Sequence, residues 1–114
     1  MCSRTGLATG AAALRDTLAN AMATYSPELL VTTTDGPPAC CCSDHISYLD
    51  HNRPATHSIH RGSTQYPHYH RATDTPANMG PHARDVGRAI VRGNLAALVE
   101  LAGYDLLFAD DFED

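Results

Sequence analysis

Two short segments of this chain carry residue types that could do chemistry. The first covers residues 43–45 and reads Ser-Asp-His; the second covers residues 66–76 and reads Tyr-Pro-His-Tyr-His-Arg-Ala-Thr-Asp-Thr-Pro. Neutral imidazole is a good zinc ligand, and a loop histidine such as His70 can approach a metal from outside the fold. His70 is one of seven histidines, so an exposed loop histidine without a metal is the alternative interpretation.

The remaining histidines and the cysteines offer weaker metal sites. His57, His60 and His68 lie in or near the second segment, and exposed histidines of this kind bind metals only weakly. Cys40–Cys42 with His45 could form a small Cys/His zinc module, although such modules use two separated pairs of ligands. Adjacent cysteines are difficult to bridge, so the sequence predicts no regular disulfide framework.

The elements that must position these residues read as alternating helices and short strands. A helix is predicted over residues 6–25, because its apolar residues recur at three- and four-residue steps. Residues 28–34 and 54–59 have the composition of strands. Ser43 is placed to cap a short helix, with Asp44 in its first turn, where a negative charge interacts favourably with the helix dipole.

A long loop and a long helix complete the chain. Residues 62–81 are rich in small and turn-forming residues and exceed what a connection needs, which indicates a functional loop. The clearest helix is predicted over residues 82–102, with Gly103 as its C-terminal stop. Its apolar side consists of Val86, Ile90, Leu98 and Leu101. Residues 104–114 carry five acidic residues and are predicted to be an acidic tail.

This order of elements favours an α/β fold, a partial three-layer sandwich with a mostly parallel sheet. Two strands cannot make a stable sheet of that kind. Leu, Ile, Val and Phe number only 20 of the 114 residues, which is low for an independent globular domain. The sequence therefore predicts an incomplete domain that expects neighbours.

The two segments together resemble the C-terminal part of the zinc-dependent exopeptidases of the leucyl aminopeptidase type, a family that also holds glutamate carboxypeptidases and glutaminyl cyclases. The resemblance is carried in the second segment by Tyr66, Pro67, Tyr69, His70, Asp74, Thr75 and Pro76. It implies that His70 is a ligand of one of two zinc ions. It also implies that Asp74 and Thr75 orient the loop around His70, and that Tyr69 lies near bound substrate. Ordinary packing of Tyr69 is the alternative interpretation.

The first segment resembles the family's stretch beside the substrate pocket. By this resemblance Ser43, Asp44 and His45 support the floor of the pocket; helix capping by the first two is the alternative. Cys42 resembles a family cysteine that is sometimes bonded to a cysteine four residues earlier. Pro38 occupies that earlier position, so the local disulfide cannot form here.

Most of the family's metal site is missing from this chain. A dinuclear zinc peptidase holds two metals about 3.5–4 Å apart. The family supplies the other ligands and the general base from an upstream His-x-Asp, a Glu-Glu pair and a further Asp, whereas no histidine precedes His45 here. We therefore expect no catalytic residue in this chain, no tight zinc binding and no peptide hydrolysis by the chain alone.

Three functions follow as expectations. The first is a fragment of an aminopeptidase-like metallopeptidase, in which residues 1–103 form the C-terminal portion and residues 104–114 the tail. It would hydrolyse terminal peptide bonds of a peptide substrate once a missing N-terminal portion is present. The second is a stand-alone, non-catalytic binding protein derived from such a domain. Formation of a homo-oligomer would cover its open sheet edge. The third is the Cys/His zinc module.

Composition argues against nucleic acid and a membrane as partners. The chain has 8 basic and 13 acidic residues and no basic stripe, which argues against nucleic acid. No apolar run reaches the roughly 18–20 residues that span a membrane, and the N-terminus has no convincing signal peptide. The sequence does not indicate the cellular compartment.

Overall fold

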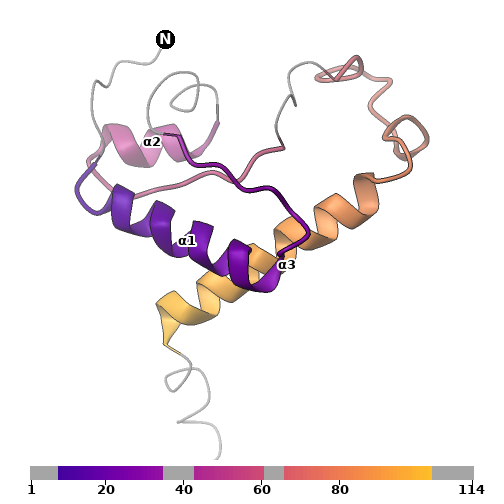
Figure 1. Cartoon of the computed structure of the whole chain (residues 1–114). Helices are drawn as coiled ribbons and strands as arrows, with labels where there is room; N and C mark the ends of the chain where they lie inside the picture. Colours follow the sequence, from indigo (N-terminus) through magenta and orange to yellow (C-terminus); the bar gives the residue numbers. More distant parts are fainter. Residues whose placement is uncertain (1–7, 35–42, 61–65, 104–114) are drawn as a thin grey trace, which may run out of the picture.

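The computed structural model describes residues 8–34, 43–60 and 66–103. They form helices α1 (Ala11–Tyr25), α2 (His45–Asp50) and α3 (Ala83–Ala102), with a single 3-10 turn, η2 (Pro76–Asn78), before α3. Figure 1 shows α1 and α3 crossing each other, with α2 near the beginning of α1. The predictions for Cys40–Cys42, for Pro38 and for the acidic tail lie outside the described residues.

The predicted α/β fold is wrong. No strand is present in the described parts of the chain, so neither the mostly parallel sheet nor the sandwich exists there. Residues 28–34 and 54–59, which have the composition of strands, run without a partner strand. Composition favours an extended backbone, but a strand also needs a neighbour to accept and donate its hydrogen bonds. Leu30 is 92% exposed, so the first segment is not packed as a sheet strand would be.

Helix α1 confirms the predicted amphipathic helix over most of its length. Its start is set by Gly10, whose φ of 83° is left-handed and favours glycine. Its end precedes Ser26-Pro27, as expected for a residue before proline. The buried residues of the helix are Ala11, Leu18, Ala21 and Met22.

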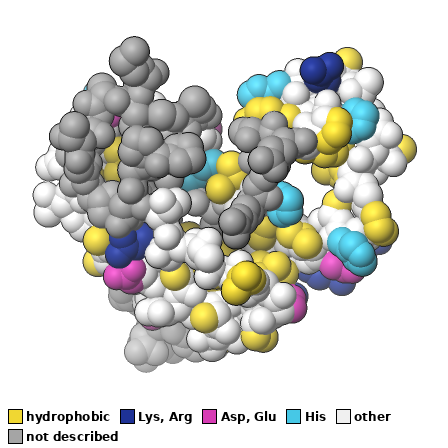
Figure 2. Space-filling view, turned by 45° about the horizontal axis from the view of Figure 1, so that its top comes forward, with side chains coloured by type: hydrophobic (Ala, Val, Ile, Leu, Met, Phe, Trp, Pro, Cys, Tyr) yellow, Lys and Arg dark blue, Asp and Glu magenta, His cyan; other side chains and the backbone are white. Residues whose placement is uncertain are grey.

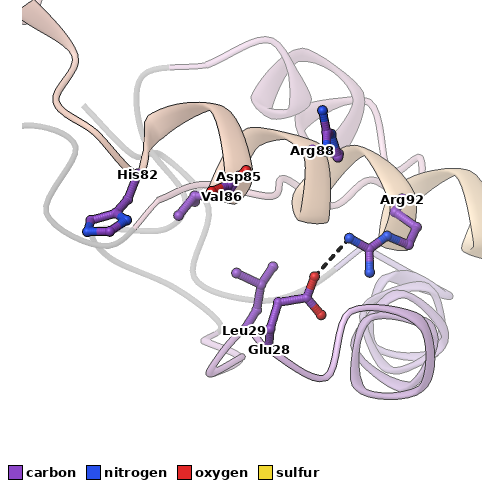
Figure 3. Close-up of a pocket in the computed structure, with 7 residues that line it drawn as sticks. All are labelled: Glu28, Leu29, His82, Asp85, Val86, Arg88 and Arg92. Carbon is purple, nitrogen blue, oxygen red and sulfur yellow. Dashed lines mark ion pairs between the residues drawn. The ribbon is translucent and has the colours of Figure 1, made fainter.

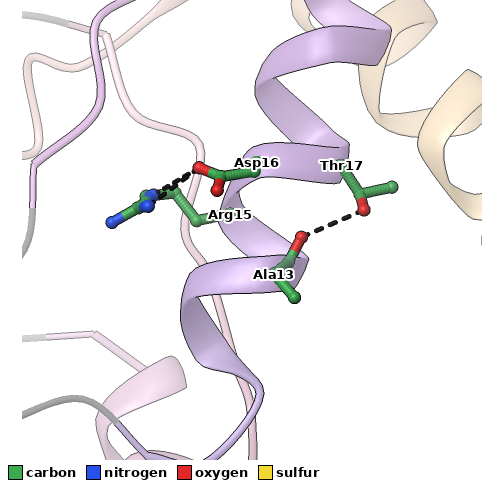
Figure 4. Close-up of polar contacts among 4 residues, drawn as sticks. All are labelled: Ala13, Arg15, Asp16 and Thr17. Carbon is green, nitrogen blue, oxygen red and sulfur yellow. Dashed lines mark hydrogen bonds and ion pairs between the residues drawn. The ribbon is translucent and has the colours of Figure 1, made fainter.

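The other side of α1 carries local polar contacts (Figure 4). Arg15 Nη2 lies 2.8 Å from Asp16 Oδ1, and Thr17 Oγ1 donates to the carbonyl oxygen of Ala13 at 3.0 Å. Both contacts join residues of the same helix. They leave the apolar side of α1 available for packing against α3.

Helix α3 confirms the predicted helix and its stop, because Gly103 has a φ of 77° directly after Ala102. Its buried side is made of small residues four apart: Ala89, Gly93 and Ala97. A side-chain carbon at Gly93 would lie 2.6 Å from Met22 Cγ, so the two helices approach closely at this point. The small residues of α3 therefore decide which side faces α1.

The four residues predicted to form the apolar side of α3 differ in their burial. Val86 and Ile90 are half-buried, whereas Leu98 and Leu101 are exposed. The prediction treated apolar size as the signal for burial. In this fold close approach to α1 requires small side chains, and the leucines lie elsewhere on the helix.

Polar contacts join the end of α1 to α3. The Ser26 hydroxyl, which is fully buried, donates to the carbonyl oxygen of Ala89 at 2.6 Å. Arg92 Nη1 donates to the carbonyl oxygen of Tyr25 at 3.0 Å. Arg92 Nη2 also lies 2.8 Å from Glu28 Oε1. These contacts fix where α3 crosses α1.

Candidate functional site

The loop that carries His70 is a succession of turns held by its own hydrogen bonds. The amide of Tyr69 donates to the carbonyl oxygen of Tyr66 at 3.0 Å, and the ring Nδ1 of His68 lies 2.8 Å from Thr73 Oγ1. Asn78 Nδ2 donates to the carbonyl oxygen of Thr73 at 2.9 Å. The loop is therefore ordered by local contacts.

His70 lies at the outside of this loop. Its φ of 57° is left-handed, which is uncommon for a residue other than glycine. The imidazole is exposed and stacks on the Tyr69 ring, with 3.9 Å between ring centroids and 17° between planes. Stacking covers one face of the imidazole, while the lone pair of its unprotonated nitrogen lies in the ring plane. The predicted zinc-ligand role of His70 stays a prediction.

Tyr66, Asp74 and Thr75 form the base of the same loop. The Tyr66 hydroxyl oxygen is buried, and burial followed by the negative charge of Asp74 raises the pKa of Tyr66. Thr75 is extended and precedes η2, where its carbonyl oxygen accepts from the amide of Asn78 at 2.9 Å. The predicted role of Asp74 and Thr75 in orienting the loop around His70 stays a prediction.

The three other predicted site residues gather around α2. Ser43, Asp44 and His45 line an open depression of about 580 Å³, together with Tyr48 and the segment that ends at His57. The predicted capping role of Ser43 is wrong, because Asp44 is the N-cap and no side chain caps α2. Ser43 contributes its carbonyl oxygen, which accepts from the amide of Ile46 at 3.1 Å.

Two histidines face each other in this depression. The rings of His45 and His57 are stacked, with 4.8 Å between centroids and 29° between planes. The pKa of His57 is lowered by burial and then by the nearby His45, and Asp44 opposes this effect. Sequence analysis did not place His57 beside His45, because 11 residues separate them and only folding joins them.

The two groups of predicted site residues do not form one site. Figure 1 shows α2 and the loop of residues 66–80 on opposite sides of the molecule. On the face shown in Figure 2, the histidines appear in several separate places. No group of three or more His, Cys, Asp or Glu side chains that could hold a metal ion occurs among residues 8–34, 43–60 and 66–103.

A charged pocket of about 380 Å³ lies between the end of α1 and the beginning of α3 (Figure 3). The Arg92–Glu28 ion pair forms part of its wall, and the side chains of Leu29 and Val86 contribute an apolar part. A backbone hydrogen bond lowers the pKa of Glu28. Burial acts in the opposite direction, and the hydrogen bond and positive charge of Arg92 lower the pKa further. Sequence analysis missed this pocket, since its lining residues fall into two groups, 28–29 and 82–92, that lie more than 50 positions apart.

Large apolar side chains are exposed on a side of α3 that faces away from α1. Val91, Leu95, Leu98 and Leu101 are exposed by 65%, 57%, 62% and 55%, respectively. They are spaced by four, three and three residues, which places them along one side of the helix. We call these four residues the outer face of α3. The sequence analysis recognised Leu98 and Leu101 as part of an apolar side, but it placed them on the same side of the helix as Val86 and Ile90.

No protein-family model, no curated protein and no solved structure matches this chain. The resemblance to zinc exopeptidases therefore rests on the two sequence segments alone. In the described residues, none of the helices has the length and apolar character needed to cross a membrane.

Proposed function

We propose that this protein acts by binding, and that the outer face of α3 receives a helical segment of a protein partner. The observation that carries this proposal is the exposure of four large apolar side chains, each by more than half, along one side of α3. Large apolar side chains exposed together along one side of a helix are typical of an interaction site.

The composition of the core supports the same conclusion. The core cluster of the described residues contains Leu18, Ala21, Met22 and Ala97, so only two of its four buried members are large. The outer face of α3 carries more large apolar side chains than this cluster buries. Covering the outer face would add substantially to the apolar area that the protein removes from water.

The spacing of the outer face suits a helical partner. Anchors that recur at three- and four-residue steps are how an amphipathic helix inserts into a groove or pairs with another helix. Self-association is one form that such binding can take. It no longer depends on a sheet edge, because the predicted strands are absent from the described chain.

Site-specific photo-crosslinking tests the proposal. A photoreactive phenylalanine analogue would replace Leu95 in the full chain, expressed in its source cells, and the linked peptides would be identified. Met79, which is 54% exposed on the loop before α3, provides the matched control position. We expect position 95 to give a defined protein adduct and position 79 to give none. Failure of positions 91, 95 and 98 alike to give an adduct would overturn the proposal.

A second proposal is that the chain is a piece of a zinc exopeptidase, and the match at residues 66–76 favours it. In the intact enzyme the zinc ions would polarise the scissile carbonyl and activate water, and His70 would be a ligand. The exposed imidazole of His70 suits an approach from outside the loop.

The native mass and metal content of the polypeptide test this second proposal. We expect a mass several-fold above 12.2 kDa, with zinc that is lost in His70→Ala and kept in His60→Ala. A mass near 12.2 kDa without zinc would exclude peptidase activity for this chain.

A further inference from the structure

We draw no further inference here: the strongest candidate, the charged pocket between the end of α1 and the beginning of α3, is lined by the Arg92–Glu28 ion pair and by further exposed groups of both signs, so nothing in the described residues selects the charge or chemistry of a ligand.

Discussion

A single hydroxyl group joins the end of α1 to the middle of α3. The Ser26 hydroxyl is fully buried and donates to the carbonyl oxygen of Ala89 at 2.6 Å. We expect Ser26→Ala to lower the free energy of unfolding by about 1 kcal/mol, because a buried hydrogen bond between elements is lost.

Urea denaturation followed by circular dichroism measures this change. Thr17→Ala is the matched control, since the Thr17 hydroxyl donates to a helix carbonyl of its own α1 on the exposed side. The control should change stability by less than about 0.5 kcal/mol. Equal losses in both variants would contradict a special role for Ser26.

The stacked His45–His57 pair gives the fold a pH dependence. The pKa of His57 is lowered in the folded chain by burial and by His45, so the unfolded chain takes up its proton first as the pH falls. Stability from neutral His57 is therefore present above about pH 6.5 and is lost as the pH drops through the folded pKa.

Melting temperatures at pH 8, 6 and 5 check this sign. We expect the decrease on acidification to be slightly smaller in His57→Gln than in the wild type. The melting temperature of His60→Gln, changed at a histidine three residues further along the same segment, should fall as that of the wild type does. An unchanged decrease in His57→Gln would show that other groups carry the pH dependence.

At the scale of the elements, Gly93 permits the close crossing of α1 and α3. A side-chain carbon there would lie 2.6 Å from Met22 Cγ and 3.2 Å from Met22 Cα, and the backbone atom cannot turn aside. We expect Gly93→Ala to destabilise the protein by about 1–3 kcal/mol, because overpacking outweighs the gain in helix propensity.

Gly87 provides the opposite case on the same helix. Nothing lies within 4 Å of a side-chain carbon at Gly87. Gly87→Ala should therefore stabilise the protein by about 0.5–1 kcal/mol through helix propensity alone. Thermal unfolding of the two variants measures the difference, and a stabilising Gly93→Ala would contradict the close contact with Met22.

The helices could be predicted from sequence because their signals are local. Apolar residues at three- and four-residue steps indicated α1 and α3, and Gly103 marked the end of α3. The buried side of α3 could not be predicted, because it depends on Met22 in a different helix. Residues 28–34 and 54–59 were misassigned for a related reason, since only a neighbouring strand can turn an extended segment into a sheet.

The candidate site was predictable only where its residues are adjacent in the chain. Ser43, Asp44 and His45 stay together because they enter one short helix. Their neighbour His57 arrives through a connection whose path no local pattern specifies. The expected link between this group and His70 came from the resemblance to the zinc exopeptidases, and the structure separates the two groups.

At the scale of the whole molecule, stability should depend on protein concentration. Self-association through the outer face of α3, one form of the proposed binding, would add burial that the monomer lacks, and mass action would then raise the melting temperature with concentration. We expect a rise of about 2–5 °C for each ten-fold increase in concentration. Differential scanning fluorimetry over a hundred-fold range measures it.

Leu98→Lys should remove this concentration dependence, whereas Met79→Lys should keep it. Both side chains are more than half exposed in the single chain, so neither change opens a cavity in the monomer. A melting temperature independent of concentration in the wild type would contradict self-association.

The pairing of α1 with α3 also constrains how the chain can fold as it is synthesised. The Ser26–Ala89 hydrogen bond spans 63 residues, and α3 is the last helix of the described chain. The core therefore cannot close until α3 has left the ribosome. Until then α1 presents Leu18 and Met22 to water and to any chaperone that binds apolar helices. Closing so long a segment is slow relative to forming either helix, so assembly of the two helices should limit the folding rate.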